Sequence, residues 1–215
     1  MNLDDRIRQQ FPGLIVTLLS VLIGLALSDL VGLARTRMTL WPLDVSTLRT
    51  WGEALAMVGC CLSVWVIFAH MAISRQRTPK LTDSAVVFVI PATILFGNSL
   101  VGQPQSWPWF YFASFYLLVS LVTWHWQVHI ALAERELAPF ARLTRPLGPL
   151  AVIYFGIPFY AVAGWADSHG YLSPVAQMVV ALTGGPAALI TAGIFVNEWH
   201  RAIAQAERAV QPVAT

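Results

Sequence analysis

The sequence has few charged residues. Only 11% of its 215 residues are Asp, Glu, Lys or Arg, whereas about a quarter of a soluble domain is charged. The shortage extends along the whole chain, and 57% of the residues are hydrophobic. This composition excludes an ordinary soluble domain and predicts an integral membrane protein in contact with the lipid bilayer. The formal net charge of +2 gives no basis for binding nucleic acid.

Cysteine is also scarce, and established catalytic motifs are missing. The two cysteines, Cys60 and Cys61, are adjacent within an apolar segment, where cysteine is typically a small core residue. No disulfide, metal site or redox compartment is inferred from them. The chain has no Ser/His pair in a nucleophile-elbow context and no zinc-protease spacing. An enzymatic activity is therefore the least favoured interpretation.

Six continuous apolar segments fill the chain instead. They cover roughly residues 12–34, 51–73, 84–101, 107–132, 147–166 and 174–199. A helix needs about 20 apolar residues to cross a bilayer core, and most of the segments have about that length. We therefore predict an all-α integral membrane protein, with residues 1–215 forming one polytopic domain of six transmembrane helices.

Three of the segments end in a similar pattern. His70, His129 and His200 each begin a run of the form His-x-Ala-[Ile/Leu]-[Ser/Ala]. This recurrence predicts three repeated antiparallel helical hairpins. The alternative is chance, because short patterns recur easily in chains that are rich in alanine and leucine.

The distribution of basic residues predicts the topology. If both termini are cytoplasmic, few basic residues face outward: Arg35, Arg37 and Arg49. The inward-facing ones are more numerous: Arg6, Arg8, Arg75, Arg77, Lys80, Arg135, Arg142, Arg145, Arg201 and Arg208. This bias follows the positive-inside rule and favours a bacterial-type inner (plasma) membrane with cytoplasmic N- and C-termini.

The histidines are candidates for proton or metal chemistry. In the predicted topology His70, His129 and His200 lie at similar depth near the cytoplasmic face, and His125 lies one turn before His129. Imidazole titrates near neutral pH and is a common ligand of metals and haem. The simpler interpretation is that interfacial histidines bury the ring and keep its polar tip in water.

Asp29 is the second candidate, within the first apolar segment beside Ser28. An intramembrane carboxylate usually faces a partner, water or a transport pathway. Alternatively, the first helix ends early and leaves Asp29 at the outer interface. Ser28-Asp29 resembles the end of the Phe-Ser-Asp signature of the lysosomal potassium channel family. Leu27 and Ile23 stand where that family has phenylalanine and arginine, so the resemblance assigns no family.

Proline and glycine interrupt three of the segments. Gly184, Gly185 and Pro186 fall near the middle of the last one, and Pro91 and Pro158 fall in the third and fifth. Such residues kink or break helices, and freed carbonyls in interrupted helices can bind cations. The alternative is close packing, because Gly184, Ala188 and Ala192 form a stripe of small residues.

These features favour a channel or transporter for protons or small cations. The predicted pathway uses Ser28 and Asp29 outside and His70, His129 and His200 inside. A homo-oligomer is favoured, because a bundle of only six helices needs partners to enclose a pore. The alternative is a redox protein in which His70, His125, His129 or His200 binds haem or a divalent metal. A further alternative is a non-catalytic membrane assembly partner or effector.

Overall fold

A computed structural model of the chain describes residues 3–37, 43–74, 81–133 and 147–210. Within these residues the structure is helical, with short turns between helices. The elements are α1 (Leu3–Arg37), α2 (Val45–Ser74), α3 (Leu81–Leu100), α4 (Trp107–Ala133), α6 (Leu147–Ser168) and α7 (Pro174–Val210). The prediction of an all-α protein is confirmed.

The helix ends follow from local capping chemistry. Asp44 precedes α2, and its carboxylate accepts hydrogen bonds from the Thr47 N–H at 2.7 Å and the Ser46 hydroxyl at 2.9 Å. This is an N-cap, which satisfies a backbone donor that the first turn leaves free. The same hydrogen bonds, led by that from the Thr47 N–H, lower the pKa of Asp44 below its usual value.

The turn between α6 and α7 has a Schellman motif. The Tyr171 N–H donates to the Ala166 carbonyl at 2.8 Å, and the Gly170 N–H donates to the Asp167 carbonyl at 3.0 Å. Gly170 has a φ of 74°, a conformation that glycine adopts without steric cost. The chain therefore reverses within a few residues and places α7 beside α6.

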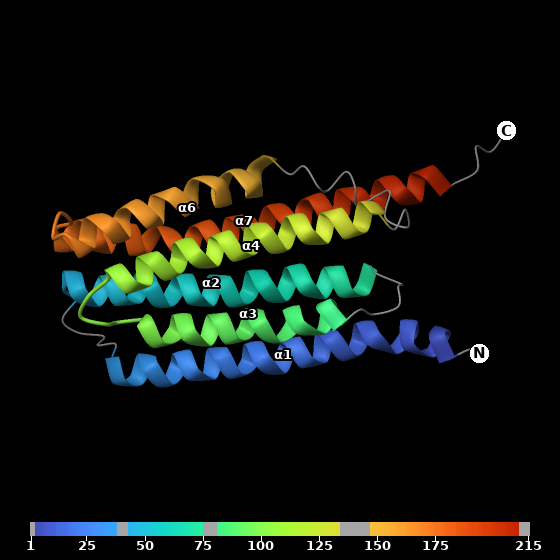
Figure 1. The fold of residues 1–215 in the computed structure, drawn as a ribbon, viewed down its shortest axis with the longest axis horizontal. Coiled ribbons are helices and arrows are strands. Elements are labelled where there is room, and N and C mark those ends of the chain that lie inside the picture. Colours follow the sequence, from blue (N-terminus) through green and yellow to red (C-terminus); the bar gives the residue numbers. More distant parts are fainter. Residues whose placement is uncertain (1–2, 38–42, 75–80, 134–146, 211–215) are drawn as a thin grey trace.

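The helices run alternately up and down in one elongated bundle (Figure 1). We call the end with the α3–α4 and α6–α7 turns the loop end, and the end where α1 begins and α7 finishes the terminal end. The most extensive helix contact joins α2 to α7, and the next joins α4 to α6. Segments distant in sequence thus form the centre of the bundle.

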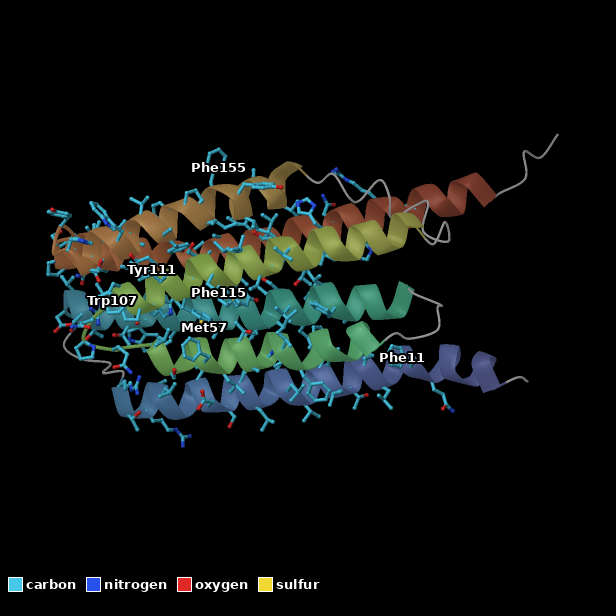
Figure 2. The ribbon with its side chains drawn as sticks, viewed as in Figure 1. Phe11, Met57, Trp107, Tyr111, Phe115 and Phe155 are labelled. Carbon is cyan, nitrogen blue, oxygen red and sulfur yellow. The ribbon has the colours of Figure 1, made fainter. Side chains whose placement is uncertain are left out.

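Three helices are long and apolar enough to cross a membrane among the residues that the structure describes: Gly13–Arg37, Val45–Ala69 and Pro174–Asn197. Two shorter apolar helices, Val87–Leu100 and Trp107–Thr123, accompany them. Many large apolar side chains are exposed on the bundle, among them Phe155, which points away from α6 (Figure 2). Such a surface is suited to lipid rather than water, so the protein is a membrane protein with at least these candidate spans.

Glycine and alanine set the contact between α2 and α7. A Cβ atom at Gly52 would lie 2.8 Å from the Leu182 nitrogen, and one at Gly184 would lie 2.7 Å from the Ala56 Cβ. The backbones of α2 and α7 therefore approach closely only because Gly52 and Gly184 have no side chain. The close-packing interpretation of Gly184 agrees with this arrangement.

The helices continue through their prolines. One proline lies inside each of three helices: Pro91 in α3, Pro158 in α6 and Pro186 in α7. α7 also includes Gly184 and Gly185 without interruption. A cation site built from broken helices therefore stays a prediction, as do the six-span count and the threefold repeat. α7 also continues from the end of its apolar stretch at Asn197 to Val210.

Candidate functional site

A buried charged pair occupies the loop end of α2. Arg49 and Glu53 are one helical turn apart, with Arg49 Nε 3.5 Å from Glu53 Oε1, and Glu53 is only 1% exposed. The Gly102 N–H donates to Glu53 Oε2 at 2.8 Å, whereas Oε1 accepts no hydrogen bond from the described residues. Gly102 has a φ of 68°, so glycine is favoured at the position that presents this N–H.

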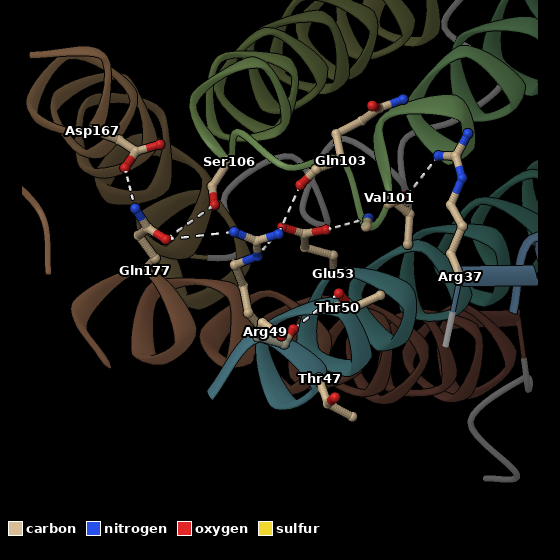
Figure 3. Close-up of polar contacts among 12 residues, drawn as sticks. Arg37, Thr47, Arg49, Thr50, Glu53, Val101, Gln103, Ser106, Asp167 and Gln177 are labelled. Atoms are coloured by element: carbon tan, nitrogen blue, oxygen red, sulfur yellow. Dashed lines mark hydrogen bonds and ion pairs between the residues drawn. The ribbon is translucent and has the colours of Figure 1, made fainter. Parts of the chain in front are cut away.

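Neighbouring polar groups extend this pair into a cluster (Figure 3). Arg49 donates to the Gln103 carbonyl at 2.7 Å and to Gln177 Oε1 at 3.5 Å. Gln177 in turn donates to Asp167 Oδ1 at 2.5 Å. We call Arg49, Glu53, Gln103, Asp167 and Gln177 the loop-end cluster. It joins α2, the α3–α4 turn, α6 and α7 at one point.

The sequence pattern does not single out Glu53. It predicts that Arg49 faces outward and that Asp29 is the acid inside a span. The available signal was the spacing of Arg49 and Glu53, four residues apart and followed by a long apolar run, because this spacing brings opposite charges together on one helix face. Burial of the pair depends on α6, α7 and the α3–α4 turn, which local sequence does not reveal.

A cavity of about 160 Å³ lies within the bundle, beginning one turn from Glu53. Side chains of α2, α3, α4, α6 and α7 line it, and its α2 wall extends from Ala56 to Phe68. That stretch of helix is roughly 18 Å long, more than half of a hydrocarbon core of about 30 Å. Ala56 and Met57 share a helix face with Glu53, so Glu53 lies about one helical turn beyond one end of the cavity.

The cavity wall is mainly apolar, and three of its hydroxyl groups donate to helix carbonyls. Ser63 donates to the Gly59 and Ala188 carbonyls at 2.7 and 2.9 Å. Ser120 and Thr191 donate to carbonyls four residues earlier, both at 2.8 Å. The space therefore presents mainly methyl groups and aromatic rings, and no carboxylate or amide side chain of the described residues lines it for a dehydrated metal cation to bind.

Asp29 lies apart from the cavity. It is an exposed residue of α1, and Asn98 of α3 donates to its Oδ2 at 3.1 Å and to the Ala26 carbonyl at 2.7 Å. Ser28 is exposed on the same helix, and α1 contributes no side chain to the cavity. The structure thus ties Asp29 to α3 and does not bring it together with the loop-end cluster or with the cavity.

The histidines are placed only in part. His70 lies near the last residues of α2 and His129 near those of α4, both at the terminal end of the bundle. The structure describes their backbones but not their side chains. His200 is exposed on α7, and His125 Nε2 lies 3.0 Å from the Tyr154 hydroxyl. In the described part of the chain, no three His, Cys, Asp or Glu side chains form a group that could hold a metal ion. Shared proton, metal or haem chemistry of the histidines therefore stays a prediction.

Comparison of the chain with protein-family models, with curated proteins and with solved structures gives no match. Functional inference therefore depends on the loop-end cluster and the adjoining cavity.

Proposed function

We propose that this membrane protein moves protons or other small cations across the bilayer, with Glu53 at the loop-end entrance. The observation that supports the proposal is a buried carboxylate near one end of a cavity in the bundle, with one oxygen that accepts no hydrogen bond from the residues that the structure describes. Ionisable groups are costly inside a membrane and are usually found where they bind a charge or line a pathway.

Among cations, the proton fits this arrangement best. No carboxylate or amide side chain of the described residues lines the cavity, so a dehydrated metal ion would find few of its preferred ligands there. A proton needs only a carboxylate that can accept and release it and a chain of water molecules. A cavity of about 160 Å³ has room for such water, and the hydroxyl oxygens of Ser63, Ser120 and Thr191 in its wall keep lone pairs that can accept hydrogen bonds from it.

Arg49 positions the carboxylate in this proposal. It holds Glu53 in place while its own guanidinium is bound to the α3–α4 turn and to Gln177. The proposed route runs from Glu53 along the α2 face towards the terminal end, and it does not begin at Asp29.

Proton flux into liposomes that contain the purified protein tests this function. A potassium diffusion potential drives the flux, and an enclosed pH-sensitive dye reports it. Glu53→Gln keeps the shape of the side chain but removes the titrating group, and we expect it to lower flux on the order of tenfold or more. Asp44→Asn is the matched control, because it removes an exposed carboxylate that lies outside the apolar stretch of α2.

Asp29→Asn separates the two possible routes. If flux depends on Asp29 and not on Glu53, the pathway from Asp29 to the histidines is correct. Flux no greater than in protein-free liposomes, or unchanged flux in a correctly folded Glu53→Gln protein, would contradict the proposal.

A further inference from the structure

Trp109 carries an unused hydrogen-bond donor at the cavity. It belongs to α4, lines the cavity and is only 2% exposed. Its indole Nε1 has no hydrogen-bond partner among the described residues. A buried donor without an acceptor is unfavourable and uncommon in folded proteins, so this group calls for a specific explanation.

The ring of Trp109 is held firmly by its neighbours. Its centroid lies 6.0 Å from that of Tyr160 in an edge-to-face arrangement. A Cβ atom at Gly184 would lie 3.6 Å from the Trp109 ring. Tyr160 uses its own hydroxyl in a 3.0 Å hydrogen bond with Thr183, so the polar atom of this neighbour already has a partner. The ring is therefore packed into the wall of the cavity that it lines.

The size and lining of the cavity define what that occupant is. An apolar protein cavity of about 150 Å³ accommodates benzene, and this one measures about 160 Å³. Its hydroxyl groups at Ser63, Ser120 and Thr191 are already bonded to carbonyls. The space therefore suits a molecule with an apolar body and a single acceptor.

We propose that this cavity binds a small, mainly apolar molecule of about one aromatic ring, whose carbonyl or ether oxygen accepts a hydrogen bond from Trp109 Nε1. The binding goes beyond the proposed transport. Its effect on transport rests on the proposed function: a molecule in the cavity displaces water from the proton route and blocks flux.

Two probes of equal shape test the hydrogen bond. Acetophenone has a carbonyl oxygen where α-methylstyrene has a CH₂ group. The protein in lipid nanodiscs, labelled with ¹⁵N in its indole groups, is titrated with each probe, and Trp109→Phe identifies the resonance of Trp109. We expect acetophenone to shift the Trp109 N–H signal downfield in a saturable manner and to bind about tenfold more tightly than α-methylstyrene.

Filling the cavity supplies an independent variant. Ala113→Leu adds bulk to the cavity wall while Trp109 is retained, and we expect it to abolish the saturable shift. Wild-type protein that shows no saturable shift overturns the proposed site. Equal affinity and equal shifts for the two probes overturn the hydrogen bond, and with it the proposed ligand class.

The flux assay separates this inference from the proposed function. Acetophenone should inhibit proton flux through the wild-type protein and leave any flux through Ala113→Leu unaffected. Saturable binding to a protein that carries no protons refutes the transport function alone. Proton flux without saturable binding refutes the ligand site alone.

Discussion

The two faces of α2 differ in how they meet their neighbours. Towards α7, Gly52 and Gly59 let the backbones approach so closely that added Cβ atoms would lie 2.8 and 2.9 Å from atoms of α7. Towards α4, Met57 and Cys60 face Trp109 and other large side chains across a cavity. We call these the glycine face and the cavity face.

The two faces show how side-chain size sets the distance between neighbouring helices in a membrane bundle. Lipid tails are as apolar as the helices, so burial alone does not draw helices together, and close van der Waals packing decides which pairs associate. Small residues allow this on the glycine face. On the cavity face, large aromatic side chains keep α4 away from α2, and the remaining space is open to a ligand or to water.

The largest effect on stability is expected from a substitution on the glycine face. Gly52→Ala places its Cβ against backbone atoms of Ala181 and Leu182, which do not move without displacing α7. We expect a loss of about 3 kcal/mol in the free energy of unfolding, because overpacking of this kind forces backbone shifts. Thermal unfolding in detergent measures it.

Gly193→Ala is the matched control, because nothing lies within 4 Å of the position of its added Cβ. It should leave the melting temperature unchanged or slightly higher. Equal melting temperatures for Gly52→Ala and Gly193→Ala would show that the contact between α2 and α7 is looser than described.

A smaller effect is expected on the cavity face. Ala113→Val adds two methyl groups to the wall of an existing space, so we expect stability to change by less than about 1 kcal/mol, in either direction. The same unfolding measurement applies. A loss as large as that of Gly52→Ala would mean that the two faces are packed equally tightly.

The smallest effect is expected at the start of α2, which positions both faces. The pKa of the Asp44 carboxylate is lowered, mainly by the hydrogen bond from the Thr47 N–H. Its contribution to stability is therefore complete above the unfolded-state pKa of about 4 and is lost as the pH falls through the lower folded-state pKa. Asp44→Ala should lower the melting temperature slightly at pH 7 and leave it unchanged at the lowest pH that the fold survives.

A melting-temperature difference between wild type and Asp44→Ala that stays constant down to that acidic limit would show that the ionised carboxylate is not what stabilises the cap. Asp44→Asn distinguishes charge from hydrogen bonding, because an amide oxygen still accepts the hydrogen bond from Thr47.

Much of the helical structure could be predicted from the sequence. Long apolar runs predict helices directly, and Gly184, Ala188 and Ala192 indicated the packing side of α7. The partner of that side could not be predicted, because the contact between α2 and α7 joins helices far apart in sequence. The burial of Glu53 could not be predicted for the same reason. Glu53 accepts a hydrogen bond from the α3–α4 turn, and the cluster around it includes residues of α6 and α7.

The candidate site was less predictable than the fold. Asp29 attracted attention because it is a lone acid in an apolar run, yet its side chain is exposed on α1 and paired with Asn98. Neither the cavity nor the free donor of Trp109 has a sequence signature, since both arise from the relative positions of five helices. Sequence identifies which groups are chemically able to act, while packing decides which of them meet.

The length of α7 has a practical consequence. The helix continues from Asn197, where its apolar stretch ends, to Val210, a rod of roughly 20 Å. Because the rod is continuous with the segment that packs against Gly52 and Gly59, any tilt of that segment is magnified at its far end. A spin label or fluorophore at that end, paired with one on α1, would convert small rearrangements around the cavity into measurable changes in the distance between the two labels.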